Sequence, residues 1–492
     1  MSLDTFSKWR RRFWPVHAFE LKKVLPLILM KFLISLIYGV FLSMKDTLIV
    51  TGEGSGAEVI PVLKAWVVLP VAIGVTVLYT KLASKYQRST LFYGTILTFV
   101  TFILLFSFVL YPNKAFLTPL ESSNWILSHI GGHYAHWVAV YRNWIETVFF
   151  VFAELWAPLV IFMLFWGLCN QINVVEEAKR YYSLFIVAGD FGTIFTGPLI
   201  VYYSRKFANV GYLFTIQSLS LCLSSLALGI LFLHWYLMKY SLPKQPLQVR
   251  EKKPRLSLIE GIRYIASSKY LRCIACMVVS YGLVINMIEV PWKASVHQLY
   301  SSTVDYQAFI AKVTSAVGFV AMFTAFFLSG NVIRMFGWRF SAMIPPVVLG
   351  STGVFFLAFV LMKRNFSPSF FLIDPLLLIV FFGAFQNIVS KTVKYSFFDP
   401  TKEMAFIPLD QESQVKGKAA IDVVGSRLGK SSSGWIQLAF MQLMGTSSVL
   451  SITGLLLPFL CTTVFYWMVS IRELSQEFSE ESADDEQATS SL

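Results

Sequence analysis

Residues 23–46 read KVLPLILMKFLISLIYGVFLSMKD. They contain an apolar run at 24–44, which is followed directly by Lys45 and Asp46. A run of about 20 apolar residues can cross a bilayer as an α-helix. Glu154, Glu289 and Lys430 also lie inside or at the end of apolar stretches. A bare charge in hydrocarbon costs roughly 3 kcal/mol or more, so such residues normally face a watery cavity or a charged partner. Together these positions predict a path for a charged solute.

The composition is that of an integral membrane protein. Of 492 residues, 56% are hydrophobic and 14% are charged, and the mean hydropathy is +0.62. Soluble domains carry about 25% charged residues. The net charge of +13 does not indicate nucleic-acid binding, because the basic loops of membrane proteins stay cytoplasmic and raise the net charge. Cys273 and Cys276 form a lone C-x-x-C, which supplies too few ligands for zinc, so no metal site or cofactor is expected.

Twelve apolar runs divide into two sets of six, separated by a basic stretch at 239–270. Their limits are 24–44, 60–80, 91–111, 145–168, 183–203, 211–238, 271–291, 308–330, 340–362, 370–390, 418–443 and 446–470. We therefore predict an all-α polytopic membrane protein with twelve transmembrane helices in two six-helix halves, 24–238 and 271–470.

The basic residues predict the orientation of these helices. If the N-terminal segment 1–23 is cytoplasmic, most of the 41 lysines and arginines fall in segments on that side. This bias follows the positive-inside rule and predicts that both termini are cytoplasmic. Residues 471–492 form an acidic tail, whose last part, 475–492, is expected to lack fixed structure. Segment 1–23 does not resemble a cleavable signal or a transit peptide.

The two halves share short patterns in the same order. Tyr38-Gly39-x4-Met44 is repeated as Tyr281-Gly282-x4-Met287, which gives Asp46 and Glu289 equivalent places. The pattern Tyr182-Ser-Leu-Phe is matched later by Tyr395-Ser-Phe-Phe. Both matches favour a duplicated six-helix unit, as in the major facilitator architecture, with a substrate site between the halves near the midplane.

The charged residues suggest an anionic solute. Lys45 and Asp46 either end a helix at the outer surface or line the path at its outer mouth. Arg427 and Lys430 lie three apart on one helical face and could clamp a polyphosphate. The stretch Gly425–Lys430 is one residue short of a phosphate loop, and no catalytic triad pattern is present, so neither an ATPase nor another enzyme is predicted.

The glutamates have less obvious roles. Glu154 has apolar neighbours on both sides and should face the bundle interior, where it binds substrate, a proton or another helix. Glu289 precedes Pro291, which bends or ends a helix and suits a gate. Aromatic residues near these charges could stack on a ring, although an interfacial anchor is the commoner role for a tryptophan. The candidates for stacking are Trp156, Trp292 and Phe385.

Several stretches resemble the bacterial and plastid ATP/ADP translocase family of intracellular bacteria, such as chlamydiae and rickettsiae, and of plastid envelopes. They are MKDTLIVT (44–51), AEVIPVLKAWVVLP (57–70), AELW (153–156), EEAKRYYSLF (176–185), GLVINMIEVPWK (282–293) and KYSFFDPTKEMAFIPLDQESQVKGKAAIDVVGSRLGKS (394–431). The resemblance covers nearly the whole chain. Two departures from the family pattern are Ser432-Ser433-Gly434, where glycines are usual, and Pro158 after AELW.

The resemblance implies an antiporter that exchanges ATP for ADP, with or without phosphate, by alternating access across a bacterial inner membrane. The family's important charges fall on Lys45, Glu154, Glu289 and Lys430, with the lysines expected to neutralise phosphate. A monomer is expected, with the nucleotides and the lipid bilayer as its partners. The alternatives are a proton-coupled importer of several nucleotides and, from another class, a lipid flippase or structural membrane protein.

Overall fold

The structure is a computed structural model that describes residues 14–173, 175–241, 263, 265–365, 374–407, 409, 421 and 425–490. Every regular element among these residues is helical. Most of the predicted linker, 239–270, lies outside them.

The N-terminal part of the chain forms helices that match the first six predicted spans. Its elements are η2 (Ala18–Glu20), α2 (Leu21–Val50), α3 (Val59–Val62), η3 (Leu63–Val68), α4 (Leu69–Lys85), α5 (Arg88–Leu105), η4 (Phe106–Leu110), α6 (Lys114–Leu117), α7 (Leu120–Ile130), η5 (Gly132–Tyr134), α8 (Ala135–Arg142), α9 (Trp144–Trp156), η6 (Ala157–Trp166), α10 (Gly167–Ile172), α11 (Val175–Ile194), α12 (Thr196–Lys206), α13 (Tyr212–Tyr236) and η7 (Leu237–Ser241). The elements α6 to α8 lie between the third and fourth spans.

The C-terminal part repeats the helical plan. Its elements are α15 (Lys269–Leu299), α16 (Thr303–Thr324), η8 (Ala325–Ser329), α17 (Gly330–Asn365), α18 (Pro375–Val393), η10 (Lys394–Phe398), α19 (Asp399–Met404), α21 (Ser426–Leu443) and α22 (Thr453–Ser490). Local chemistry fixes some of the helix starts. Asp374 Oδ1 accepts a hydrogen bond of 2.8 Å from the Leu376 N–H, and Pro375 occupies the first turn of α18, where its missing N–H is not needed.

The helices agree with the predicted membrane protein, although the exact number of spans stays a prediction. Ten helical stretches of the described residues are long and apolar enough to cross a bilayer. One of them, Thr303–Lys363, has 61 residues and covers two predicted spans. Gly337 interrupts it with a φ of 77°, a conformation that favours glycine. The prediction of an unstructured acidic tail was wrong, because α22 continues to Ser490.

Two hydrophobic clusters hold the helices together. One is built almost entirely from residues before 240, including Phe149, Trp156 and Phe165. The other centres on α15, α17, α18 and α22, with Trp292, Phe356 and Trp467 among its members. Each cluster lies mainly within one set of helices, and we call these sets the N-terminal half and the C-terminal half. Residues of the N-terminal half, such as Ile49, Ile60 and Phe150, also join the second cluster.

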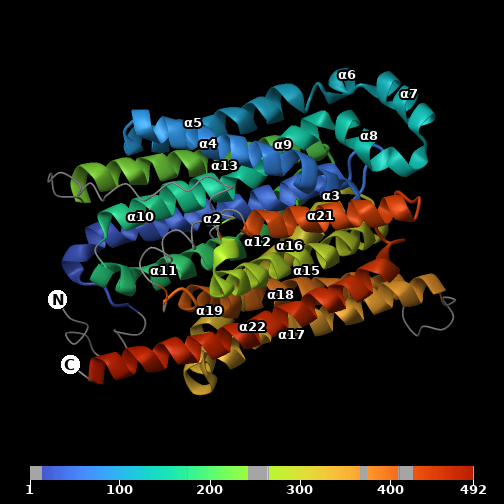
Figure 1. Ribbon diagram of the computed structural model, residues 1–492. Helices are drawn as coiled ribbons and strands as arrows, with labels where there is room; N and C mark the ends of the chain where they lie inside the picture. Colours follow the sequence, from blue (N-terminus) through green and yellow to red (C-terminus); the bar gives the residue numbers. More distant parts are fainter. Residues whose placement is uncertain are drawn as a thin grey trace.

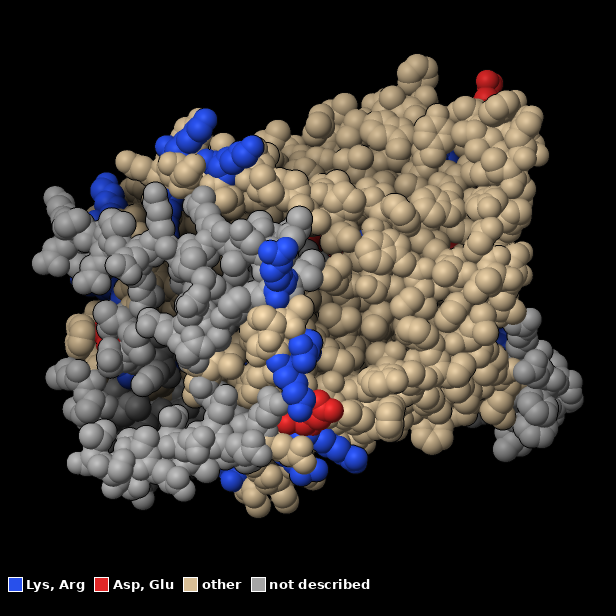
Figure 2. Space-filling model, viewed as in Figure 1, with Lys and Arg blue, Asp and Glu red and all other residues tan. Residues whose placement is uncertain are grey.

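The long helices run roughly parallel to one axis (Figure 1). α2 begins and α22 ends at the left of the view, which we call the terminal end; α6, α7 and α8 lie at the opposite, far end. Basic side chains gather towards the terminal end of the face seen in Figure 2, whereas the remainder of that face carries few charges. A broad uncharged surface of this kind suits contact with lipid.

Candidate functional site: a lysine–carboxylate cluster

Seven charged side chains from both halves form one connected set of ion pairs, which we call the charge cluster. Its members are Lys45 and Asp46 on α2, Lys64 on η3, Glu154 on α9, Glu289 and Lys293 on α15, and Lys391 on α18. The cluster contains four ammonium groups and three carboxylates, and so retains a positive charge.

Lys45 is the centre of the part that belongs to the N-terminal half. Its ammonium lies 2.8 Å from Asp46 Oδ1 and 3.0 Å from Glu154 Oε1, and it sits 4.1 Å from the centre of the Phe150 ring. The side chain is only 2% exposed. Lys45 therefore does not end α2 at an open surface, and Glu154 faces the bundle interior beside it. α2 continues beyond Lys45 and Asp46 and ends at Val50.

Lys293 joins the two halves. Its ammonium lies 2.8 Å from Asp46 Oδ2 on α2 and 3.1 Å from Glu289 Oε1, one helical turn earlier on α15. Lys64 makes a second connection, because its ammonium lies 4.0 Å from Glu289 Oε2 and donates to Asn286 Oδ1. All of these side chains are buried or nearly so, which reduces screening by water and salt.

Glu289 is the common counter-ion of three lysines. Besides Lys293 and Lys64, Lys391 approaches Glu289 Oε1 at 3.3 Å. Three ammonium groups around one carboxylate make an arrangement that could equally surround a phosphate, because a phosphate offers several anionic oxygens to hydrogen-bond donors. The sequence pairs Glu289 with Asp46 by duplication, and the structure brings these two carboxylates to the same lysine.

Lys430 lies beside this cluster and is not paired within it. It is exposed, and it makes no hydrogen bond or ion pair with the residues that the structure describes, although it is within electrostatic range of Glu154. α21 reaches this position through close contact with α15, since a Cβ on Gly429 would lie 2.8 Å from the Val279 carbonyl oxygen. Arg427 occupies the first turn of α21, and its side chain lies outside the described part of the chain.

The three aromatic candidates do not lie together at the cluster. Trp156 is buried in the N-terminal half, where it packs against Phe41 and Phe99 and donates to the Ile34 carbonyl at 3.1 Å. Trp292 is buried in the C-terminal half and donates to the Val380 carbonyl at 3.0 Å. Phe385 is 52% exposed on α18. The two tryptophans thus have protein neighbours that a nucleobase would have to displace.

Lys64, Lys293 and Lys391 belong to the charge cluster, but the sequence interpretation did not select them. Lys64 had a usable signal, because it stands alone inside the apolar stretch VIPVLKAWVVLP and so meets the same criterion as Lys45 and Glu154. Lys293 follows Glu289 by four residues and belonged to the motif that drew attention to that glutamate. Lys391 had no such signal, because it resembles an ordinary lysine of a cytoplasmic loop.

The ion pairs of the described residues differ between the two ends of the bundle. Towards the far end, Lys293–Asp46 and Lys64–Glu289 cross from one half to the other. Towards the terminal end, Arg180–Glu20 (2.6 Å), Lys23–Glu177 (2.6 Å) and Lys394–Asp399 (3.0 Å) each join residues of the same half. The two halves are therefore tied by charge at the far end.

The exposed fraction of the cluster lysines, and of Lys430 beside them, increases from the far end towards the terminal end. Lys45 and Lys293 are 2% and 3% exposed, whereas Lys391, near the end of α18, is 29% exposed and Lys430 is exposed. The cluster is therefore closed on one side and accessible on the other. Among the described residues no group of His, Cys, Asp or Glu has the arrangement of a metal site. The chemistry on offer is reversible binding of an anion between two halves.

Solved structures of known proteins share the fold of this chain. The nucleoside transporter NupG has a similar fold, with a TM-score of 0.52 and 13% identity over 92% of this chain and 98% of that chain. A D-xylose-proton symporter is similar to the same degree, with a TM-score of 0.53 and 12% identity over 92% of this chain and 97% of that chain. At these identities the likeness concerns the fold alone, and it is the fold expected from the duplicated halves.

Sequence relatives are much closer. The chain is 37% identical over 502 residues to "ADP,ATP carrier protein 1" of Chlamydia trachomatis, which covers 98% of this chain and 93% of the relative. It is 38% identical to "ADP,ATP carrier protein 1, chloroplastic" of Arabidopsis thaliana, over 96% of this chain and 76% of the relative. The family model described as "TLC ATP/ADP transporter" matches residues 1–478. The resemblance seen in the motifs is confirmed, and the chain belongs to the TLC ATP/ADP transporter family.

Proposed function

We propose that this protein exchanges ATP for ADP across a bacterial inner membrane by alternating access, with the charge cluster and Lys430 as the phosphate site. The observation that carries the proposal is the set of four cluster lysines held by only three carboxylates between two helical halves. The relatives named as ADP,ATP carriers supply the choice of nucleotide.

Glu289 and Glu154 act as internal counter-ions in this proposal. When no nucleotide is bound, they neutralise lysines that would otherwise be left charged and unpaired inside the protein, a costly state. An arriving phosphate competes with the carboxylates for these lysines. Lys430 makes the first contact, because it is exposed and has no partner among the described residues, and Lys391 and Lys64 follow deeper in the site.

The same ion pairs account for exchange. Opening the far end requires Lys293 to leave Asp46 and Lys64 to leave Glu289. Two unit charges about 4 Å apart interact by about 4 kcal/mol at an effective dielectric constant of about 20. An empty transporter gains nothing to offset these losses, whereas bound phosphates offer the released lysines a new anion. Reorientation is then fast only with a nucleotide bound, which is the condition for antiport.

The orientation completes the proposal. The basic side chains at the terminal end support a cytoplasmic position for that end, by the positive-inside rule. The far-end ion pairs then close the outer side, and the more exposed Lys391 and Lys430 are reached from the cytoplasm. The proposal includes a monomeric transporter in which phosphate can accompany ADP.

Transport into liposomes tests the proposal. Purified protein is reconstituted in vesicles that contain ADP, ATP, another nucleotide or buffer alone, and the uptake of labelled ATP is followed. The proposal predicts uptake only into vesicles that contain ADP or ATP. Uptake into empty vesicles driven by a pH gradient would instead indicate proton-coupled import. Absence of nucleotide uptake under every condition would exclude both functions.

A further inference from the structure

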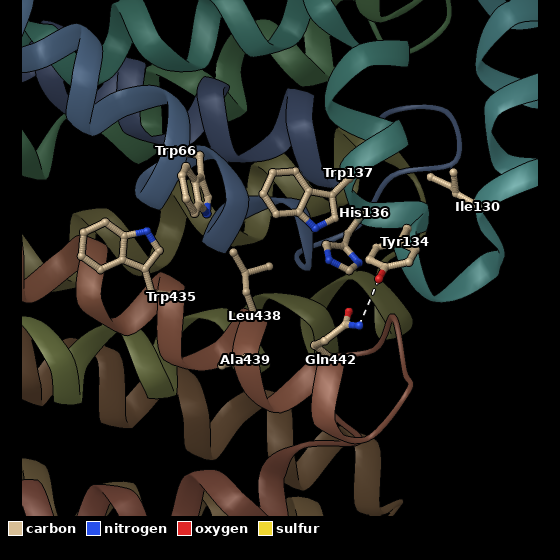
Figure 3. Close-up of a pocket in the computed structure, with 9 residues that line it drawn as sticks. All are labelled: Trp66, Ile130, Tyr134, His136, Trp137, Trp435, Leu438, Ala439 and Gln442. Carbon is tan, nitrogen blue, oxygen red and sulfur yellow. Dashed lines mark hydrogen bonds between the residues drawn. The ribbon is translucent and has the colours of Figure 1, made fainter.

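A pocket of about 850 Å³ lies between η3, α8 and α21 (Figure 3). It lies at the seam between the halves, because η3, α7, η5 and α8 supply one wall and α21 supplies the other. Its lining residues are Trp66, Ile130, Tyr134, His136, Trp137, Trp435, Leu438, Ala439 and Gln442. The volume is within the range of about 300–1,000 Å³ that is usual for ligand sites.

The pocket is separate from the nucleotide site. Trp66 and Lys64 are two residues apart on η3, which turns their side chains to different faces of the helix. Trp66 is 57% exposed, whereas Lys64 is 11% exposed and points to Glu289. No lysine, arginine, aspartate or glutamate is among the nine lining residues, so the pocket offers no counter-charge to a nucleotide.

The lining changes from apolar to polar along the direction of the helices. In Figure 3, Trp66 and Trp435 lie towards the terminal end, and their rings are 6.4 Å apart. Tyr134, His136 and Gln442 lie towards the far end. The face over α8 and α21 carries few charges (Figure 2), and Trp66 belongs to a candidate membrane span, so the apolar end of the pocket is suited to contact with the bilayer. A lipid of the bilayer would place its headgroup at the membrane surface, near the far end, and its acyl chain towards the middle of the bilayer. The polar and apolar ends of the pocket lie in the same order.

The polar end of the pocket has unused hydrogen-bonding capacity. His136 is only 7% exposed, and its Nδ1 has no hydrogen-bond partner among the residues that the structure describes. Leaving such a buried group unpaired costs about 1–3 kcal/mol. The Tyr134 hydroxyl accepts a hydrogen bond of 3.0 Å from Gln442 Nε2 and keeps its own proton to donate. These two groups can meet the oxygen atoms of one ligand.

The charge of the ligand follows from the same residues. Burial lowers the pKa of His136 to about 4, so the imidazole is uncharged at neutral pH. A ligand with a net negative charge would therefore find hydrogen-bond donors here but no cationic side chain to neutralise it. A zwitterion carries its own positive charge and needs no cationic side chain. The indole rings of Trp66, Trp137 and Trp435 provide an apolar surface for an acyl chain.

We propose that this seam pocket binds a zwitterionic glycerophospholipid of the bilayer. Its phosphate or ester oxygens bond to Tyr134 and His136, and an acyl chain lies along Trp66, Trp435 and Leu438. Because the two walls belong to different halves, the lipid stabilises the arrangement in which η3 and α21 are in contact. Binding depends on no nucleotide, so it can be tested independently of the transport reaction.

Native mass spectrometry with defined lipids tests the site. The delipidated protein is titrated with phosphatidylethanolamine or with phosphatidylglycerol of identical acyl chains. We expect one phosphatidylethanolamine to bind with at least tenfold preference. Ala439→Trp, which fills the pocket, should weaken that binding at least tenfold, whereas Leu443→Trp, on an exposed position of the same helix, should not. Equal binding of both lipids, or unchanged binding to Ala439→Trp, would overturn the proposal.

A second variant keeps the test valid if the added indole prevents folding. The double variant Tyr134→Phe/His136→Phe retains the apolar lining and removes both hydrogen-bonding groups. Its affinity for phosphatidylethanolamine should fall at least tenfold, and its preference over phosphatidylglycerol should disappear. Wild-type affinity and preference in this variant would show that the lipid, if bound, lies elsewhere. Counterflow of labelled ATP is measured in parallel, so that a failure of transport is recognised separately from a failure of lipid binding.

Discussion

Lys293 is the residue whose removal should most directly open the far end. Its ammonium bonds to Asp46 of the other half at 2.8 Å and to Glu289 at 3.1 Å, and its side chain is 3% exposed. Truncating one partner of a buried, hydrogen-bonded charge pair costs about 2–5 kcal/mol. Asp46 keeps Lys45 as a partner and Glu289 keeps Lys391, so the lower part of this range applies.

A loss of about 2–3 kcal/mol changes an equilibrium about 30- to 140-fold. In Lys293→Met we therefore expect the population with an open far end to rise by such a factor. Asp46→Asn in the same protein should recover part of the effect, because it removes the buried carboxylate that Lys293→Met leaves with one lysine in place of two.

Distances between spin labels measure this opening. Labels are placed at Phe116 on α6 and at Ser301 after α15, both exposed, in a protein whose five cysteines have been replaced. The control is Lys114→Met, which removes an ion pair of 3.0 Å with Glu146 that lies within the N-terminal half. Equal distance distributions in Lys293→Met and wild type, or an opening of equal size in Lys114→Met, would refute the reasoning.

Three further predictions concern binding, turnover and pH. Lys430→Ala should weaken ADP binding at least tenfold in equilibrium titrations without lowering the melting temperature, whereas Lys85→Ala, an exposed lysine at the end of α4, should do neither. Glu289→Gln should lower both KM and kcat for exchange, because the freed lysines hold phosphate more tightly and release it more slowly; an unchanged KM would contradict this. Burial lowers the pKa of His136 from 6.5 to about 4. As the pH falls, the unfolded chain therefore binds a proton at a higher pH than the folded protein does, and the stability of the fold should decrease as the pH falls from 6.5 to about 4. His136→Asn should show a smaller loss of melting temperature from pH 7 to pH 5, and an identical loss would exclude this origin.

The helices were predictable because each apolar run carries its own signal. The two spans within α16 and α17 could be predicted because length and hydropathy depend on the local sequence alone. Pro345, Pro346 and Gly337 did not hide them, nor did Arg334 and Arg339 beside that glycine. The tail was mispredicted for a related reason. Its acidic composition suggested an open chain, whereas glutamate, alanine and glutamine are also good helix formers and continue α22.

The site was predictable only where a charge stood out from its surroundings. Lys45, Glu154 and Glu289 interrupt apolar runs, and the structure brings them into one set of ion pairs. The pairing itself depends on contacts between α2, α9, α15 and α18, which no spacing in the sequence reveals. Lys391 belongs to the cluster because α18 places it against Glu289, although its sequence context is that of a loop lysine. The positions of the aromatic side chains near these charges depend on packing between helices, which the sequence does not reveal. Trp156, for example, is part of the hydrophobic core.

A structure of the protein with bound ADP tests the central claim most directly. The account predicts the phosphates between the halves, within about 4 Å of the ammonium groups of Lys430 and Lys391, with at least one of the ion pairs of Glu289 broken. Phosphates bound away from these lysines, with the Glu289 pairs intact, would contradict it.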